Sequence, residues 1–217
     1  MAPKPQVHLF FDCLSPYSYL YYQALGHYES ALPAEIFRRP VFMAAIFKGT
    51  KNTGLPALNP QKFKYMQEAT ARLGKYYGIP NFNIVDEFAK QALKQSSVRT
   101  MRFVTAVQKE QPQDADRLIR ELFQRLFIHN EWITSAEALE KICKKLGLPT
   151  SLIEATNSEV VKKTLKDNTD EALAEGAFGV PYVLLKNQGE TEHFFGVESL
   201  PQLCHSLGVE FKGPLNV

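Results

Sequence analysis

The order of apolar and polar positions predicts a strand and a helix at the start of the chain. The apolar run 7–11 is short and rich in branched and aromatic residues, which indicates a buried strand. Ser15 can cap the helix that follows, and Pro16 suits its first position, where no N–H donor is needed. The helix is expected over 17–29 and a second strand over 35–42. Strand, helix and parallel strand form a right-handed βαβ unit.

The middle of the chain changes character. Residues 47–60 are rich in glycine, asparagine and proline, so a loop is predicted there. Between residues 62 and 175 the apolar positions recur with helical spacing and show almost no strand signal. The predicted helices span 62–77, 86–95, 98–110, 114–128, 135–146 and 158–175.

Strand character returns near the carboxyl end. Two short strands are predicted at 181–185 and 193–195, joined by a turn at 187–190, and a last helix fits 200–207. The simplest fold is therefore one α/β domain interrupted by an all-helical insertion. We place the split α/β domain at 1–60 and 177–217 and the insertion at 61–176.

Composition excludes several classes of protein. The 217 residues contain 25 Lys and Arg against 23 Asp and Glu, a net charge of +2, so no basic footprint for nucleic acid is present. No apolar run is long enough to predict a membrane span. Cys13, Cys143 and Cys204 are odd in number and widely spaced, which argues against a disulfide framework and favours a reducing compartment. The histidines lack metal-ligand spacing, so no metal site is expected.

The first candidate for chemistry is the hydroxyl of Ser15. It lies between the first strand and the first helix, at the sheet edge where open α/β folds bind ligands. Three interpretations stay open: a helix cap, a hydrogen bond to an anionic ligand atom at the positive end of the helix, and a nucleophile. The last is disfavoured because no Gly-x-Ser-x-Gly motif surrounds the residue. Cys13 nearby is interpreted as a buried, inert thiol.

Three further segments are weaker candidates. Pro181 follows the glycine-rich segment 176–179 and opens a strand, so a cis peptide bond is one interpretation of it. Glu198 precedes the last helix, where an acid either complements the helix dipole or binds a ligand ammonium group. Asn52 and Lys62 lie near the loop that leaves the second strand, where a turn residue and a solvated cation are the ordinary interpretations.

Six segments, in this order and spacing, resemble one known family. They are Phe10-Phe11-Asp12-x-Leu14-Ser15-Pro16-Tyr17-Ser18, Lys62-x-x-Tyr65-Met66, Met101-Arg102-Phe103-x-Thr105-Ala106-Val107, Asn130-Glu131-x-Ile133-Thr134, Gly176-Ala177-Phe178-Gly179-Val180-Pro181 and Phe195-Gly196. Over essentially its whole length the chain resembles the kappa-class glutathione transferases. That resemblance implies a thioredoxin-like domain interrupted by a helical domain, which agrees with the pattern above. Disulfide oxidoreductases of similar layout carry C-x-x-C where this chain has Ser15-Pro16-Tyr17-Ser18, so dithiol exchange is unavailable here.

The resemblance also implies roles for particular residues. Ser15, beside Pro16 and Tyr17, would hydrogen-bond the sulfur of glutathione. Glutathione would act as a cosubstrate, and no tightly bound cofactor is expected. The backbone of Val180, ahead of a cis Pro181, would pair with the cysteinyl backbone as an added strand.

The resemblance assigns the two ends of glutathione as well. Asn52 and Lys62 would serve its glycyl end, and Val197 with Glu198 would hold the γ-glutamyl end. At these last two positions the family commonly has Ser-Asp, so Val197 lacks the hydroxyl and Glu198 keeps the charge on a longer arm.

The resemblance implies an enzyme that conjugates glutathione to small apolar electrophiles in detoxification. It further implies a homodimer in mitochondria or peroxisomes, although the residues show no targeting address and leave the cytosol open. Two alternatives remain. One is a glutathione-dependent 2-hydroxychromene-2-carboxylate isomerase, which shares the Ser-Pro-Tyr-Ser start. The other is a non-catalytic module that binds glutathione or a protein, which Val197 favours. The physiological electrophile cannot be read from the sequence.

Overall fold

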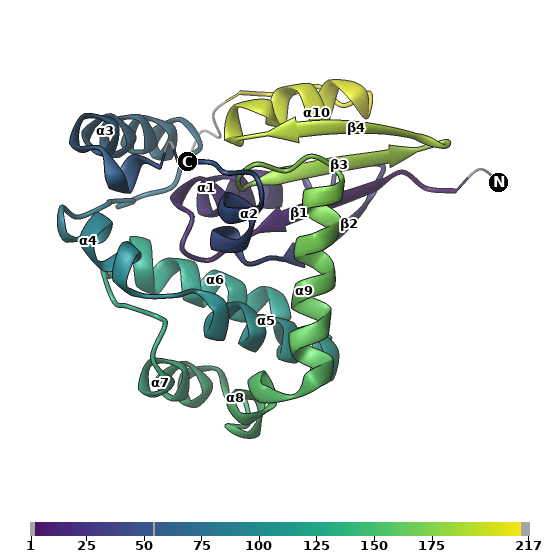
Figure 1. Cartoon of the computed structure of the whole chain (residues 1–217). Coiled ribbons are helices and arrows are strands. Elements are labelled where there is room, and N and C mark those ends of the chain that lie inside the picture. The colour runs from purple at the N-terminus through teal and green to yellow at the C-terminus, as the bar shows by residue number, and fades with distance from the viewer. Residues whose placement is uncertain (1–2, 54, 214–217) are drawn as a thin grey trace.

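A four-stranded mixed sheet forms the centre of the α/β part (Figure 1). The computed structural model describes residues 3–53 and 55–213, so residues 1–2, 54 and 214–217 of the expected thioredoxin-like segments lie outside the described part. The strands are β1 (Gln6–Phe11), β2 (Glu35–Pro40), β3 (Tyr182–Asn187) and β4 (Glu190–Phe195), in the order β2-β1-β3-β4. β1 is parallel to β2, as the βαβ pattern predicts, and antiparallel to β3. The two ends of the sequence therefore share one sheet.

Helices make up the rest of the regular structure. They are α1 (Pro16–Tyr28), α2 (Met43–Gly49), η1 (Pro56–Leu58), α3 (Pro60–Tyr76), α4 (Glu87–Lys94), α5 (Val98–Glu110), η2 (Pro112–Asp114), α6 (Ala115–Phe127), α7 (Ala136–Leu146), α8 (Ser151–Glu154), η3 (Ala155–Asn157), α9 (Glu159–Ala174), η4 (Val197–Ser199) and α10 (Leu200–Ser206). All six helices predicted for the middle of the chain are present, with ends that differ from the predicted ones by at most two residues. Between β2 and β3 the described residues form no strand. The predicted fold class, a thioredoxin-like domain interrupted by helices, is confirmed.

The loop predicted at 47–60 is wrong in part, because it contains the end of α2 and all of η1. The amino end of α2 has no cap from a neighbouring side chain. Instead, the N–H of Met43 donates to Oδ2 of Asp12 at 3.0 Å, and the N–H of Phe42 donates to Oγ1 of Thr169 at 3.1 Å. Because both acceptors are distant in sequence, no local pattern of residues predicts the start of this helix.

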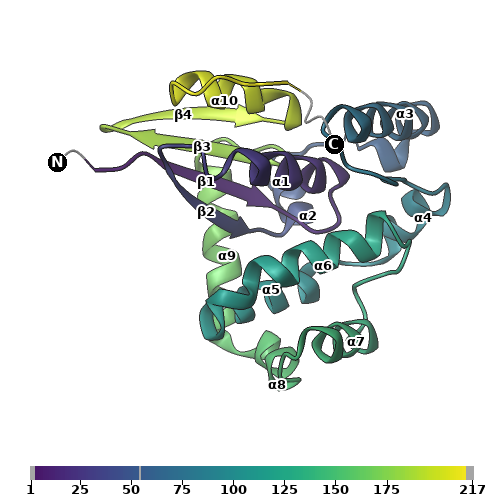
Figure 2. The same cartoon turned by 180° about the vertical axis from the view of Figure 1, so that it is seen from behind.

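The two faces of the sheet bury alternate residues, as the period of a strand requires. Phe10 packs in one cluster with Tyr182 and Leu184, on the side of α2 and α9. Leu9 and Phe11 point to the opposite side, into the larger cluster that includes α1. Figure 1 shows α2 and α9 in front of the sheet, and Figure 2 shows α1 in front of it. The sheet is therefore covered on both faces.

Stacked aromatic rings join α1 to the helical part. The Tyr19 ring lies 5.2 Å from Phe123 and 5.7 Å from Phe127 and Phe82, measured between ring centroids. Each such pair contributes about 0.5–1.5 kcal/mol beyond the area that it buries. Tyr19, Phe123 and Phe127 are all buried. This stack makes the helical insertion and the first helix one packed unit.

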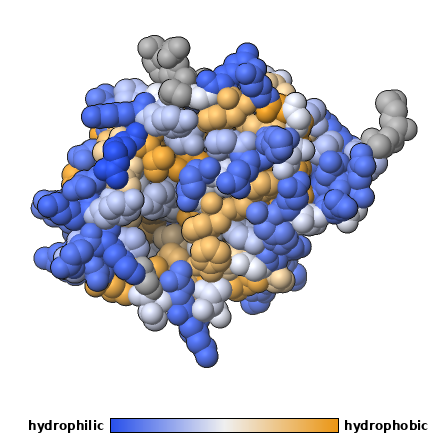
Figure 3. Space-filling model, turned by 90° about the horizontal axis from the view of Figure 1, so that it is seen from above, coloured by the Kyte–Doolittle hydropathy of each residue, from blue (hydrophilic) through white to orange (hydrophobic). Residues whose placement is uncertain are grey.

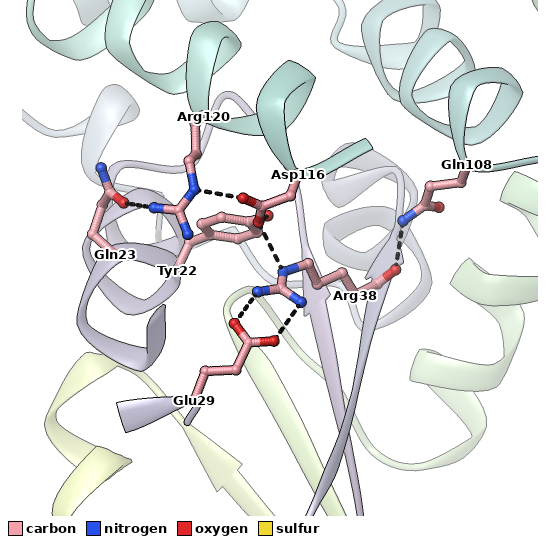
Figure 4. A network of polar contacts seen from close by, with 7 residues as sticks. All are labelled: Tyr22, Gln23, Glu29, Arg38, Gln108, Asp116 and Arg120. Atoms are coloured by element: carbon pink, nitrogen blue, oxygen red, sulfur yellow. Dashed lines mark hydrogen bonds and ion pairs between the residues drawn. The ribbon is translucent and has the colours of Figure 1, made fainter. Parts of the chain in front are cut away.

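A polar network makes a second link between the same parts (Figure 4). The Arg38 guanidinium on β2 donates to both carboxylate oxygens of Glu29 and forms an ion pair with Asp116 on α6. Asp116 also accepts hydrogen bonds from Tyr22 on α1 and from Arg120. The network therefore links β2 and α1 to α6. In the part of the chain that the structure describes, no helix is both long and apolar enough to cross a bilayer.

Candidate active site

Ser15 occupies the turn that links β1 to α1. The N–H of Ser15 donates to the carbonyl of Asp12 at 2.9 Å, which forms the turn. The Oγ of Ser15 accepts the N–H of Ser18 at 3.1 Å, so the helix-cap interpretation is confirmed. The same Oγ donates to the carbonyl of Val180 at 3.1 Å. Ser15 thus caps α1 and also contacts the segment that enters β3.

Val180 precedes a cis peptide bond to Pro181, as the sequence suggested. Within residues 3–53 and 55–213, the N–H of Val180 donates no hydrogen bond, while its carbonyl accepts only the Ser15 hydroxyl. An extended peptide needs one donor and one acceptor of this kind to pair with a backbone edge. Val180 therefore presents both groups at the point where Ser15 lies.

The Asp12 carboxylate joins three segments that lie around Ser15. Its Oδ1 accepts the N–H of Leu14 at 2.9 Å, and its Oδ2 accepts the N–H of Met43 at 3.0 Å and the Oγ–H of Ser97 at 2.6 Å. The carboxyl is fully buried, and this burial raises its pKa although the three hydrogen bonds act in the opposite direction. Asp12 fixes the β1–α1 turn, α2 and the start of α5 relative to one another. Sequence reasoning did not select it.

A large apolar cavity, cavity 1, opens beside Ser15 with a volume of about 610 Å³. Four of the predicted residues besides Ser15 line it: Pro16, Tyr17, Asn52 and Val180. The remaining wall is mainly apolar and includes Met43, Phe47, Leu55, Phe88, Phe178 and Phe195. This composition suits an apolar ligand with a few fixed polar contacts.

A second cavity, cavity 2, has a volume of about 750 Å³. Tyr17, Val180 and Phe195 line both cavities, so the two meet at these residues. Pro181 and Glu198 from the predicted set line cavity 2. The surface seen from above is hollowed, with apolar and polar residues side by side around the hollow (Figure 3).

Two predicted residues lie outside both linings. Lys62 is exposed in the first turn of α3, where its N–H donates to Oδ1 of Asn59 at 3.0 Å. Val197 is fully buried, and its carbonyl accepts the hydroxyl of Tyr77 at 3.0 Å. Among the described residues, neither Lys62 nor Val197 belongs to the wall of cavity 1 or cavity 2. The structure therefore gathers the other predicted residues around Ser15 but not these two.

Asn52 anchors the loop after α2. Its side-chain N–H donates to the carbonyl of Phe178 at 2.9 Å. The ring of Phe178 packs in turn against the tilted ring of Phe195, with 4.4 Å between the ring centroids and 40° between the ring planes. Asn52 therefore fixes the segment that leads into Val180, in addition to lining cavity 1.

Tyr17 stands where the two cavities meet. Burial raises the pKa of its phenol, and the negative charges of Glu198 and an ionised Tyr65 act in the same direction. The phenol therefore stays protonated at neutral pH and can donate a hydrogen bond to a ligand. Cys13 is fully buried, and burial followed by the nearby Asp12 raises the pKa of its thiol. The interpretation of Cys13 as an inert thiol is confirmed.

The wall of cavity 2 contains residues that sequence reasoning missed. Tyr65, Ala69, Arg72 and Tyr76 all line it and come from α3. Their spacing of four, three and four residues places them on one stripe of the helix. This helical spacing was the signal in the sequence that could have identified them. In residues 3–53 and 55–213 no three metal-ligating side chains gather.

Comparison with known proteins shows the family of the chain. Residues 6–208 match the model of the DSBA-like thioredoxin domain. Glutathione S-transferase kappa 1 of Rattus norvegicus is 32% identical over 99% of this chain and 96% of its own length. The human protein of the same name is 33% identical over the same shares. The solved structure of a 2-hydroxychromene-2-carboxylate isomerase has a TM-score of 0.77 at 21% identity and covers 94% of each chain. This last likeness concerns the fold.

Proposed function

The chain belongs to the kappa class of glutathione transferases, within the DSBA-like thioredoxin family, and from that membership we propose that Ser15 stabilises the glutathione thiolate for attack on a small apolar electrophile. The observation that carries this proposal is the position of the Ser15 hydroxyl. It lies at the amino end of α1, 3.1 Å from the carbonyl of Val180 and at the wall of cavity 1. Glutathione is the cosubstrate, and the family membership supports a transferase reaction.

Binding begins with the backbone of Val180. The cysteinyl residue of glutathione pairs with the N–H and the carbonyl of Val180 as a short added strand. The N–H of the cysteinyl residue then donates to the carbonyl of Val180, which accepts the Ser15 hydroxyl in the free protein. The hydroxyl then turns from this carbonyl to the sulfur, which lies at the entrance of cavity 1.

The free energy needed to ionise the thiol is modest. A thiol with a pKa near 8.5 is only a few per cent thiolate at pH 7. Lowering that pKa by about two units requires roughly 2.7 kcal/mol. A charge-assisted hydrogen bond from Ser15 and the positive end of α1 are together of this magnitude. Ser15 is a stabilising donor in this mechanism and forms no covalent bond.

The reaction itself takes place in cavity 1. The thiolate donates an electron pair to an electrophilic carbon, forms the carbon–sulfur bond and displaces a leaving group that departs with its own pair. The apolar wall holds the body of the electrophile and excludes water, which strengthens the hydrogen bond to the sulfur.

Replacement of Ser15 tests the proposal. We expect Ser15→Ala to raise the pKa of the bound thiol and to lower turnover at pH 7 by about ten- to a hundredfold, because roughly 1.4–2.7 kcal/mol of thiolate stabilisation is lost. Thiolate ultraviolet absorbance followed through a pH titration measures the pKa. Ser18→Ala is the matched control, since the buried Ser18 hydroxyl has no hydrogen-bond partner among the described residues. An identical titration in Ser15→Ala and the native protein would contradict the role of Ser15.

The same preparation separates the alternative functions. Conjugation of a chloronitrobenzene supports the transferase, whereas turnover of the chromene carboxylic acid with no conjugation supports the isomerase. Binding to immobilised glutathione without either activity supports the non-catalytic module. The homodimer and the mitochondrial or peroxisomal location remain part of the proposal, supported by the resemblance alone, and light scattering and cell fractionation test them.

A further inference from the structure

Cavity 2 carries two opposite charges from two different elements. Arg72 comes from α3, and Glu198 comes from η4, next to Gly196 and Pro181. Among the described residues, these are the only charged side chains in its wall. A cavity of this kind favours a ligand that carries a cation and an anion close together.

Both side chains are exposed, and neither charge is paired with another residue of the described part. The Arg72 guanidinium lies over the Tyr65 ring, 5.9 Å from its centroid. Within the described ranges, Arg72 and Glu198 make no ion pair or side-chain hydrogen bond, with each other or with another residue. Arg38 is the contrast, because its guanidinium is bonded to Glu29 and paired with Asp116 (Figure 4). The Arg38 charge serves the fold, and the charges of cavity 2 are available to a ligand.

The backbone around Glu198 holds its carboxylate close to the main chain. Gly196 has a φ of 77°, a conformation that residues with a Cβ rarely adopt. A Cβ added there would lie 2.4 Å from Oε2 of Glu198. The carboxylate therefore folds back over Gly196, near the backbone of Pro181 and Val180 that receives the cysteinyl residue. The carbonyl of Pro181 accepts the N–H of Gly196 at 3.2 Å, which joins these two segments.

The stripe on α3 forms another part of the wall of cavity 2. Ala69 is small and leaves space between Tyr65 and Tyr76, which are 64% and 43% exposed. The Tyr65 ring supports the Arg72 guanidinium by a cation–π contact. A guanidinium held in this way is suited to a planar carboxylate.

The geometry points to Arg72 as a further residue that recognises the γ-glutamyl end of glutathione, with its guanidinium on the α-carboxylate. Glu198, which the family resemblance already assigns to this end, takes the α-ammonium. This inference rests on the proposed function, which places the sulfur at Ser15 and the cysteinyl backbone at Val180. From there one end of glutathione enters cavity 2. Only the γ-glutamyl end carries both charges, on one carbon atom, and it matches the two charges of the wall. Arg72 supplies the donor that Val197, which has no polar side chain, cannot supply.

Thiol peptides that lack one charge test each contact separately. Calorimetry on the full chain measures the Kd of glutathione, of 4-aminobutanoyl-Cys-Gly, which lacks the α-carboxylate, and of glutaryl-Cys-Gly, which lacks the α-ammonium. We expect Arg72→Gln to weaken glutathione about tenfold and 4-aminobutanoyl-Cys-Gly less than twofold. We expect Glu198→Gln to weaken glutathione and 4-aminobutanoyl-Cys-Gly, with less than a twofold effect on glutaryl-Cys-Gly.

Controls keep the outcomes distinct. Lys75→Gln changes an exposed cation in the last turn of α3 and should leave every Kd unchanged. Arg72→Lys should restore part of the affinity that Arg72→Gln loses. If Arg72→Gln weakens all three peptides by the same factor, or none, the contact with the carboxylate is refuted. If the native protein binds none of the peptides, the proposed function itself fails.

Discussion

The two cavities that meet at Tyr17 differ in what the protein does with polar groups. Cavity 1 is walled mainly by apolar side chains, and Lys94 is the one charged side chain that the described residues place in this wall. Asp12, which joins the elements that form the wall, is buried and accepts three hydrogen bonds. Cavity 2 has charges of both signs in its wall, on the exposed side chains of Arg72 and Glu198. A wall with both charges favours a ligand that carries both.

This contrast assigns different parts of the reaction to the two cavities. An apolar wall binds an electrophile by burial and discriminates weakly among shapes, because each methylene contributes only about 1–3 kcal/mol. Charged groups discriminate strongly, because a ligand that lacks the matching charge leaves one of them unpaired. We therefore expect broad selectivity for electrophiles and narrow selectivity for the thiol.

Removal of the Asp12 carboxylate should have the largest effect on stability, and it tests whether Asp12 organises cavity 1 selectively. Asp12→Ala leaves the N–H groups of Leu14 and Met43 and the Ser97 hydroxyl without their acceptor, which should cost about 3–5 kcal/mol of unfolding free energy. Urea unfolding measures the loss. At low temperature the KM for the electrophile should rise more than the Kd of glutathione, and equal changes would show that Asp12 does not organise cavity 1 selectively.

Asp12→Asn isolates the charge of the same group. Burial raises the folded pKa of Asp12 above its ordinary value of 3.8, so the folded protein binds this proton more tightly than the unfolded chain. The resulting contribution to stability is complete below pH 3.8 and is lost as the pH rises through the folded pKa. Asp12→Asn should lack this decline. Parallel curves of unfolding free energy against pH for the two proteins would contradict it.

A matched pair of substitutions, one in each cavity, should have effects of intermediate size on the KM values for the two substrates. Ala44 lines cavity 1 only, and Ala69 lines cavity 2 only. Ala44→Phe should raise the KM for a bulky electrophile about tenfold, because the added ring occupies its space, and leave the KM for glutathione unchanged. Ala69→Phe should do the reverse. Steady-state kinetics with each substrate varied in turn give both constants, and a rise in the same constant for both variants would show that the cavities are not separate.

Substitution of Asp116, which lies outside both cavities, should have the smallest effect on stability and serves as a control for the substrate constants. Burial raises its pKa, but hydrogen bonds from Tyr22 and Arg120 and the charges of Arg120 and Arg38 outweigh this and lower it. Its contribution to stability is therefore present above pH 3.8 and is lost as the pH falls through the folded pKa. Because the carboxylate is partly exposed, Asp116→Asn should cost only about 0.5–1 kcal/mol near neutral pH and flatten the acid limb of stability. Changed KM values for either substrate in Asp116→Asn would show that the polar network around Asp116 influences the candidate active site.

Local patterns predicted the frame of the molecule well. The strand over β1, the cap at Ser15 and the six predicted helices, α3 to α7 and α9, depend on neighbouring residues, which a short window of sequence contains. The segment of α2 was interpreted in part as loop, since its amino end is capped by Asp12 and Thr169 from other elements.

The candidate site divides in the same way. The order and spacing of residues along the chain determined the α/β frame with its helical insertion, the position of Ser15 at a helix start and the family to which the chain belongs. Only the tertiary structure decided that Ser15 meets Val180, that Lys62 and Val197 lie outside both cavities, and that Arg72 and Glu198 line the same cavity. The reason is physical: capping and periodicity act between neighbours in sequence, whereas a cavity wall is made by elements that packing of the core brings together.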